Sequence, residues 1–282
     1  MKSEGMEVLK LEHVTKQFGG LTAVDDVTFN IREGEIFGLI GPNGAGKTTI
    51  FNLINGVYAL SAGKILFYGK TIGEGAEERK KVLKLKPFQI ADMGISRTFQ
   101  NIRLFRNLSV YDNVLIACHR SANYGLFESL LRLKGTRFAR QEKVLRHKAD
   151  ELLDLMGLMF YRDVISDNLP YGLQRKLEIA RALALEPKLL LLDEPAAGMN
   201  PEETSSLMQM IRSIRDQFNL TVLIIEHHMD LIMGVCDRIH VLNFGKSLAE
   251  GTPGQVQSSP AVIEAYLGVQ DGALYAVKEG EQ

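Results

Sequence analysis

The chain of 282 residues contains no tryptophan and only two cysteines, and its formal net charge is close to zero at -1. This balance of charge gives no electrostatic reason to expect nucleic acid, so we predict no nucleic-acid partner. Cys118 and Cys236 lack the spacing of metal ligands. A disulfide framework is therefore not expected, and reduced thiols are the simpler interpretation.

A long apolar run is also missing from the sequence. The most apolar stretches, residues 189–192 and 220–225, have the length of strands, whereas a membrane-spanning helix needs about 20 apolar residues. The N-terminal stretch MKSEGMEVLKLEHV lacks the apolar centre of a secretory signal. Any association with a membrane is therefore expected to come through a partner.

What the sequence does contain is an alternation of short apolar runs and longer helical patterns. This alternation predicts an α/β fold with a parallel sheet covered by helices, and residues 36–40, 188–192 and 220–225 are its clearest strands. Residues 200–203, Asn-Pro-Glu-Glu, give the start signals of an amphipathic helix. The apolar stripe expected on that helix is Leu207, Met210, Ile211, Ile214 and Phe218.

Two other regions read differently. Residues 8–11, 23–31 and 64–68 are short strands separated by Gly and Asp turns, which suggests an antiparallel β layer. Residues 108–168 are mainly helical, as expected of a helical subdomain inserted into the core. Its expected stripe is Val144, Leu145, Ala149, Leu152, Leu153 and Met156.

We therefore predict one domain with inserted parts. The β layer and the phosphate-loop core take residues 6–104, the helical subdomain 105–170 and the rest of the core 171–270. Residues 271–282 are expected to form a loosely held tail.

The stretch GPNGAGKTT follows an apolar strand and fits the phosphate-loop pattern G-x-x-x-x-G-K-[ST]. Glycines let successive backbone N–H groups point at one phosphate, and the following helix adds its positive N-terminal end. Lys47 is expected to reach the β- and γ-phosphates, and the Thr48 hydroxyl to ligate Mg²⁺. The predicted nucleotide-binding residues here are Gly41, Pro42, Asn43, Gly44, Ala45, Gly46, Lys47, Thr48 and Thr49.

The stretch LLLLDEP supplies two acids at the end of a buried strand. Asp193 is placed to hold Mg²⁺, and Glu194 to polarise an attacking water. Taken alone, the pattern also describes a strand that ends in two solvated acids. The phosphate loop about 140 residues upstream favours the catalytic interpretation.

The order of motifs resembles the ATP-binding cassette (ABC) ATPases. GPNGAGKTT, RTFQ, PYGLQRKLEIARAL, LLLLDEPAAGMN and IIEHHM follow one another as in that family, and they span most of the chain. The stretches FGGLTAV, GISRTFQNIRLF and DEPAAGMNP are most similar to the LivG type, the ATPase subunit of branched-chain amino acid importers.

The resemblance implies roles for three further residues. Gln100 matches the glutamine that senses Mg²⁺ and the γ-phosphate, so the implied metal ligands are Thr48, Gln100 and Asp193. His227 matches the switch histidine that contacts the γ-phosphate. Phe18 matches an aromatic residue that stacks on adenine, although a buried Phe in a β layer is an equally good interpretation.

The family also uses a signature turn that faces the ATP bound to the opposite subunit. Tyr171, Gly172, Leu173 and Gln174 align with it, with Tyr in place of Ser and Leu in place of the second Gly. A backbone N–H at a helix start binds an anion whatever its side chain, so we predict a working site. Asn200 replaces the aspartate that the family usually has in the loop after the LLLLDEP stretch.

The resemblance further implies a peripheral protein on the cytoplasmic face of the membrane. Its expected ligands are ATP and Mg²⁺, and its expected partners are transmembrane permease subunits and a second ATPase chain, identical or related. A periplasmic or extracellular binding protein would be an indirect partner. Residues 101–105 are where a permease helix would dock, although a packed loop is an equally good interpretation.

Three alternatives stay open on the sequence alone. The chain resembles, less closely, the ATPases of urea, lipid or lipopolysaccharide transport, which share the same chemistry. A non-transport ABC ATPase would be expected to carry coiled coils, zinc modules or a second cassette, and none is seen in the sequence. A regulator that has lost hydrolysis is disfavoured by Glu194 and His227.

Overall fold

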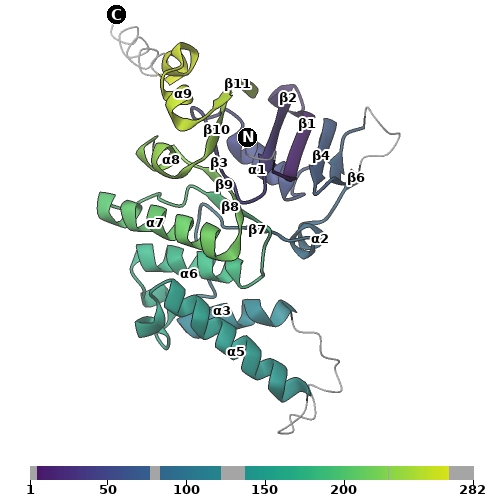
Figure 1. Ribbon diagram of the computed structural model, residues 1–282. Coiled ribbons are helices and arrows are strands. Elements are labelled where there is room, and N and C mark those ends of the chain that lie inside the picture. The colour runs from purple at the N-terminus through teal and green to yellow at the C-terminus, as the bar shows by residue number, and fades with distance from the viewer. Residues whose placement is uncertain (1–4, 77–82, 122–136, 228, 267–282) are drawn as a thin grey trace, which may run out of the picture.

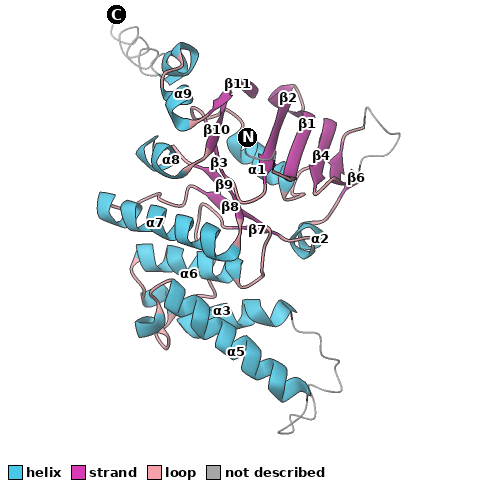
Figure 2. Cartoon of the chain, viewed as in Figure 1, coloured by secondary structure: helices cyan, strands magenta, loops and turns pink. Residues whose placement is uncertain are grey.

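The computed structural model describes residues 5–76, 83–121, 137–227 and 229–266. Two β-sheets and a set of helices make up layers, with the antiparallel sheet on one side and the helices α6, α7, α3 and α5 on the other (Figure 1). Figure 2 shows the central sheet running between them. In the parts of the chain that the structure describes, none of the helices combines the length and the hydrophobicity of a membrane span.

The central sheet has the order β11-β10-β3-β9-β8-β7. All neighbours in it are parallel except β10 and β11, which are antiparallel. Every residue of β3, β8 and β9 is buried, as expected of parallel strands covered on both faces. The strands are β3 (Ile36–Ile40), β7 (Ile95–Arg97), β8 (Leu189–Asp193), β9 (Thr221–Ile225), β10 (Arg238–Asn243) and β11 (Lys246–Gly251).

Alternate residues of these strands belong to two separate cores. Side chains that alternate along a strand point to opposite faces of the sheet. Ile36 and Ile40 of β3 pack with the helices, whereas Phe37 and Leu39 pack with α1 and the antiparallel sheet. The central sheet therefore holds the helical layer and the β layer together.

The antiparallel sheet has the order β2-β1-β4-β5-β6. The predicted short strands 8–11 and 23–31 are parts of two twelve-residue strands. His13 and Asp26 have positive φ angles of 50° and 54°, and the register shifts near them, as expected of bulges in a twisted ribbon. The strands are β1 (Glu7–Phe18), β2 (Leu21–Arg32), β4 (Ala62–Phe67), β5 (Lys70–Glu74) and β6 (Leu83–Lys84).

The helices of the predicted subdomain pack on one another and on α6. The boundaries 6–104, 105–170 and 171–270 stay predictions, and the tail 271–282 lies outside the described residues. The helices are α1 (Lys47–Ile54), α2 (Pro87–Asp92), α3 (Val110–Cys118), α5 (Arg137–Leu155), α6 (Tyr171–Leu183), α7 (Pro201–Phe218), α8 (Met229–Val235) and α9 (Pro253–Gln257). The short 3₁₀ helices are η1 (His119–Ser121), η2 (Met159–Tyr161) and η3 (Ser166–Asn168).

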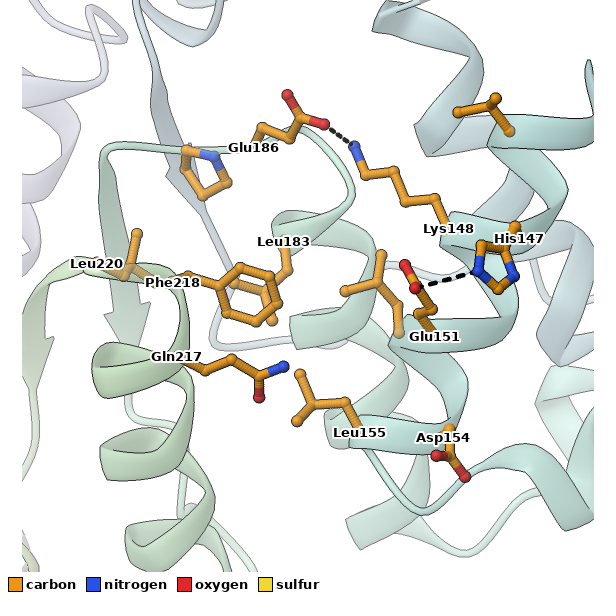
Figure 3. A pocket seen from close by; sticks show the side chains of 13 residues that line it. His147, Lys148, Glu151, Asp154, Leu155, Leu183, Glu186, Gln217, Phe218 and Leu220 are labelled. Carbon is orange, nitrogen blue, oxygen red and sulfur yellow. Dashed lines mark hydrogen bonds and ion pairs between the residues drawn. The ribbon is translucent and has the colours of Figure 1, made fainter. Parts of the chain in front are cut away.

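Two residues of the expected helix stripes are not in the core. Val144 is 66% exposed and Phe218 is 47% exposed, so their prediction as core residues was wrong. Both line a cavity of about 780 Å³ between α5 and the end of α7, together with Leu183 and Leu220 (Figure 3). The helices do not close over this cavity, and the two apolar side chains at its edge stay open to solvent.

Candidate active site

The phosphate loop connects β3 to α1 and depends on two glycines that no other residue could replace. Gly41 has a φ of 151°, and a Cβ there would lie 2.1 Å from the carbonyl oxygen of Leu242. Gly46 has a φ of 101°, and its Cβ would lie 2.6 Å from the carbonyl oxygen of Ala23. Both positions combine a left-handed backbone with a close approach of another strand. The loop is thus packed closely against β10 on one side and β2 on the other.

Gly46 is also the N-cap of α1 and makes no side-chain capping bond. The first N–H groups of a helix have no partner within the helix, so they are available to an anion. Asn43, Gly44 and Thr48 are exposed to solvent. Gly41 and Ala45 are buried, whereas Pro42, Gly46 and Thr49 are half-buried. One side of the loop is therefore packed against the protein, and the other side is open to solvent.

Lys47 is only 8% exposed, and its ammonium turns back onto the loop. Its Nζ donates hydrogen bonds to the carbonyl oxygens of Gly41 at 2.6 Å and Pro42 at 3.0 Å. Burial lowers the pKa of Lys47, and the charges of Glu194 and Asp193 act in the opposite direction. A cation with this little solvent around it favours an anionic ligand strongly.

The two acids lie at the end of β8, beside the loop. Asp193 is 3% exposed, and its Oδ2 accepts a hydrogen bond from Nη2 of Arg97 at 2.6 Å. Glu194 has a positive φ of 47°, and its N–H donates to the carbonyl oxygen of Ile225 at 2.9 Å. A left-handed glutamate is uncommon and costs energy, and such residues cluster at functional sites.

The structure brings together the three residues predicted to be catalytic, although they come from three different segments. Nε2 of Gln100 donates to Oε2 of Glu194 at 2.9 Å. Nδ1 of His227 lies 3.7 Å from Oε1 of the same carboxylate. His227 is fixed at its backbone, where its N–H donates to Oε2 of Glu226 at 2.9 Å. Glu194 is therefore held between a neutral donor and an imidazole.

The predicted signature residues form the start of α6, whose N-cap is Pro170. The N–H groups of Leu173 and Gln174 donate to the carbonyl oxygen of Pro170 at 3.0 Å, so the N–H groups of Tyr171 and Gly172 are the ones at the open end. The Gln174 side chain donates to the carbonyl oxygen of Leu169 at 2.9 Å. It stabilises its own turn rather than pointing outward.

Two further residues of the same helix have a role in the site that was not predicted from the sequence. Arg175 is fully buried, and its Nη1 donates to Oε2 of Glu178 and to the carbonyl oxygen of Phe99, both at 2.6 Å. Its Nη2 donates to the carbonyl oxygen of Gln100 at 2.9 Å and to the Tyr171 hydroxyl at 3.3 Å. Arg175 therefore ties the start of α6 to the segment that carries Gln100.

Glu178 completes this connection from the other side of the buried pair. Its Oε1 accepts hydrogen bonds from the N–H groups of Phe99 at 3.2 Å and Arg103 at 3.4 Å. Burial raises the pKa of Glu178, while Arg175 and the two backbone donors oppose that shift. The sequence signal for this buried pair is an Arg and a Glu three residues apart on a helix, and an exposed ion pair on a helix surface has the same spacing.

Asn200 and Phe18 have local structural roles. Oδ1 of Asn200 accepts from the N–H of Glu203 at 2.9 Å, and Oε2 of Glu203 accepts from the N–H of Asn200 at 3.0 Å. This is a capping box at the start of α7. Phe18 is 40% exposed at the end of β1 and packs edge-on against Tyr58, with the Lys16 ammonium 4.7 Å from its ring centre. Phe18 is therefore not a buried Phe of the β layer.

Comparisons with known proteins agree with this arrangement of a phosphate loop, an acidic strand end and a signature helix. The profile of the ABC transporter family matches residues 24–197. A second profile, "Branched-chain amino acid ATP-binding cassette transporter", matches residues 246–272. The first covers more than half of the chain, and the second lies at its C-terminal end.

Three known proteins illustrate the likeness. The high-affinity branched-chain amino acid transport ATP-binding protein LivG of Salmonella typhimurium is 45% identical over 93% of this chain and 98% of its own. The lipopolysaccharide export system ATP-binding protein LptB of Haemophilus influenzae is 35% identical over 94% and 99%. The crystal structure of the ADP conformation of MJ1267, an ATP-binding cassette of an ABC transporter, has a TM-score of 0.77 at 30% identity over 93% and 99%.

The fold and the site define a P-loop ATPase with a helical subdomain. The chain belongs to the ABC transporter family of ATP-binding cassettes. The predicted family, fold class and ATP-hydrolase class are thereby confirmed.

Proposed function

We propose that this chain is the ATP-hydrolysing subunit of an importer for branched-chain amino acids. The observation that carries this proposal is the likeness to LivG proteins, which extends over 98% of their length. The second profile match at residues 246–272 supports it, because this part lies beyond the shared ATPase motifs. The likeness to LptB is lower at 35% identity, so lipopolysaccharide transport is the weaker candidate.

The residues beside the phosphate loop fit Mg²⁺ as the partner of ATP. Hydroxyl, carboxylate and amide oxygens are hard ligands of the kind that Mg²⁺ prefers. Thr48 is exposed at the start of α1, Asp193 lies at the end of β8, and Gln100 keeps its amide oxygen because Nε2 donates to Glu194. When bound, the metal would neutralise charge on the β- and γ-phosphates. These three residues would hold it.

Glu194 is the proposed base for hydrolysis. Gln100 and His227 fix its carboxylate from two sides, so it is oriented before a water molecule enters. His227 is 48% exposed in its side chain and can turn toward a γ-phosphate. Lys47 supplies positive charge for the developing oxyanion, provided that it exchanges its two carbonyl contacts for phosphate oxygens.

The site is proposed to be completed by a second ATPase chain. The open N–H groups of Tyr171 and Gly172 lie at the positive end of α6, which favours the γ-phosphate of ATP bound to the partner. ATP would hold two chains together, and hydrolysis would release them. We propose that this cycle drives transmembrane permease subunits from the cytoplasmic face, with an extracytoplasmic binding protein as an indirect partner.

The proposed permease contact is the loop that follows Gln100. A cavity of about 430 Å³ lies between this loop and the start of α6, and its lining includes Asn101, Ile102, Leu104 and Tyr171. The same loop is bound to α6 through Arg175 and Glu178. A push from a permease helix at this cavity would therefore reach Gln100 and the signature turn together.

The experiment that tests the ATPase part compares the native chain with Glu194→Gln by light scattering. We expect Glu194→Gln to form a stable dimer with Mg²⁺-ATP and not with ADP, because ATP is bound but not hydrolysed. Glu264→Gln changes an exposed carboxylate on the C-terminal side and serves as the matched control. A variant that binds ATP and stays monomeric would contradict the composite site of two identical chains.

The substrate is tested separately, with the complete transporter in proteoliposomes. We expect ATP-driven uptake of leucine that is competed by isoleucine and valine and is not affected by urea. Uptake of urea or export of lipopolysaccharide in place of leucine uptake would overturn the assigned substrate and leave the ATPase assignment intact.

A further inference from the structure

A buried arginine connects two of the elements that carry proposed metal ligands, α1 and β8. Arg97 is the last residue of β7. Its Nη2 donates to Oδ2 of Asp193 at 2.6 Å, and its Nη1 donates to Oδ1 of Asn52 at 2.7 Å. Asn52 lies on α1 four residues after Thr48, which is about one helical turn. The guanidinium therefore spans the distance between the phosphate-loop helix and the end of β8.

The surroundings hold this arginine in place. The side chains of Arg97 and Asp193 are 8% and 4% exposed. The guanidinium lies 5.4 Å from the ring centres of both Phe51 and Phe99, a distance typical of a cation–π contact. A planar fork that is bonded at two ends and flanked by two rings has a fixed orientation. Arg97 therefore cannot leave Asp193 by a simple rotation into solvent.

This pairing has a consequence for the metal. Asp193 has one oxygen engaged by a fixed positive charge and only the other free for a cation. A buried carboxylate whose charge is already compensated attracts a divalent cation less than an uncompensated one. Bound ATP would bring additional negative charge and phosphate oxygens, and these restore the attraction.

We propose that Arg97 is a positioning residue that orients Asp193 and suppresses metal binding in the absence of nucleotide. The metal then enters the site together with ATP rather than before it. This inference rests on the proposed function, in which Asp193 holds Mg²⁺. Arg97 itself acts only through Asp193 and Asn52 and is not assigned a contact with substrate.

Binding of Mn²⁺ to the nucleotide-free full-length chain tests this role, with the free ion followed by electron paramagnetic resonance. We expect Arg97→Gln to bind Mn²⁺ at least about tenfold more tightly than the native chain. Arg97→Lys keeps the charge and should bind Mn²⁺ about as weakly as the native chain. Adding Asp193→Asn to Arg97→Gln should abolish the gain.

Arg238→Gln is the matched control. Arg238 is another largely buried arginine, with its side chain 15% exposed and paired with Glu35 and Glu250. It lies at the start of β10, away from the phosphate loop at the far end of β3. Its loss should destabilise the fold without changing the affinity for Mn²⁺. A gain in this variant would mean that any lost arginine exposes a carboxylate, and would overturn the proposal.

The results distinguish the positioning role of Arg97 from the metal-binding role of Asp193. If folded Arg97→Gln binds Mn²⁺ no more tightly than the native chain, or if the gain survives Asp193→Asn, the role of Arg97 is refuted. If Asp193→Asn alone leaves Mn²⁺-ATP binding unchanged, the metal role of Asp193 in the proposed function fails instead.

If Arg97→Gln folds poorly, its melting temperature provides a second test of the role of Arg97. We then expect its lower melting temperature to be recovered either by millimolar Mn²⁺ or by Asp193→Asn, because both remove the unpaired carboxylate charge. Failure of both to recover it would show that Arg97 supports the fold by other means, and would overturn the proposal.

Discussion

The two halves of the site are built in different ways. The phosphate half consists of consecutive residues between β3 and α1, and its shape follows from glycine geometry and the close approach of β2 and β10. The signature half depends on Arg175 and Glu178, which bind a segment about 76 residues earlier in the chain. The residues of one half are thus contiguous in the sequence, and the other half depends on a buried ion pair within α6 whose hydrogen bonds reach a distant segment.

The largest effect is expected from a substitution that disrupts the phosphate half and leaves the signature half intact. Lys47→Ala removes the one buried ammonium of the loop, together with its bonds to Gly41 and Pro42. We expect a loss of about 10²- to 10³-fold in the rate of ATP hydrolysis, the usual cost of removing a fixed charge from a transition-state site. The measurement is steady-state phosphate release with saturating Mg²⁺-ATP.

A neighbouring lysine provides the control for this loss. Lys246 is 69% exposed and forms only a surface ion pair with Asp25. Lys246→Ala should leave the rate of hydrolysis within about twofold, because exposed pairs contribute little. A similar loss in both variants would indicate a general effect of lysine removal near the loop rather than a role of Lys47.

The second-largest effect is expected from a substitution that disrupts the signature half and leaves nucleotide binding by the single chain intact. Arg175→Met leaves Glu178 buried without its cation, so we expect the free energy of unfolding to fall by about 3–5 kcal/mol. ATP affinity of the single chain should be unchanged, whereas the ATP-dependent dimer should be lost. Chemical denaturation and light scattering measure the two quantities.

The pH dependence of Arg175→Met is a further check on this explanation. Burial already raises the pKa of Glu178, and loss of Arg175 raises it further. A carboxylate with a raised pKa in the folded state destabilises the protein as pH rises through that pKa, so the loss should be smaller at acidic pH. Tyr171→Phe removes only the weaker contact to Arg175. An equal loss in Tyr171→Phe, or a loss independent of pH, would contradict the role of the ion pair.

The same contrast explains what could be predicted from the sequence. The strand 36–40, the phosphate loop and the start of α7 were predicted because the residues that form each of them are contiguous in the sequence. Arg97 and Arg175 were not, because their partners Asp193, Phe99 and Gln100 lie far away in sequence. Nothing in a single sequence distinguishes a buried arginine from an exposed one. The convergence of Gln100, Glu194 and His227 was expected only through the family resemblance.

The apolar stripes predicted for the helices included two exposed residues for a related reason. Periodicity gives the direction in which a side chain points and not whether another element covers it. Val144 and Phe218 have the spacing expected of core residues, but both line the cavity between α5 and α7 and are exposed to solvent. Their exposure is decided by how far apart α5 and α7 lie, which is a property of the whole fold.

The smallest expected effect concerns Asn200, which lies next to the signature half and is bonded locally like the phosphate half. Asn200→Ala removes the side-chain oxygen that caps α7 and keeps the reciprocal bond from its own backbone N–H to Glu203, so we expect a loss of about 1 kcal/mol in the free energy of unfolding. Asn200→Asp keeps an oxygen that caps the helix equally well and adds a negative charge at its positive end. Its stability should equal that of the native chain or exceed it slightly. If Asn200→Asp loses as much stability as Asn200→Ala, the asparagine is needed for its amide donors and not as a cap, and the local explanation of this position is wrong.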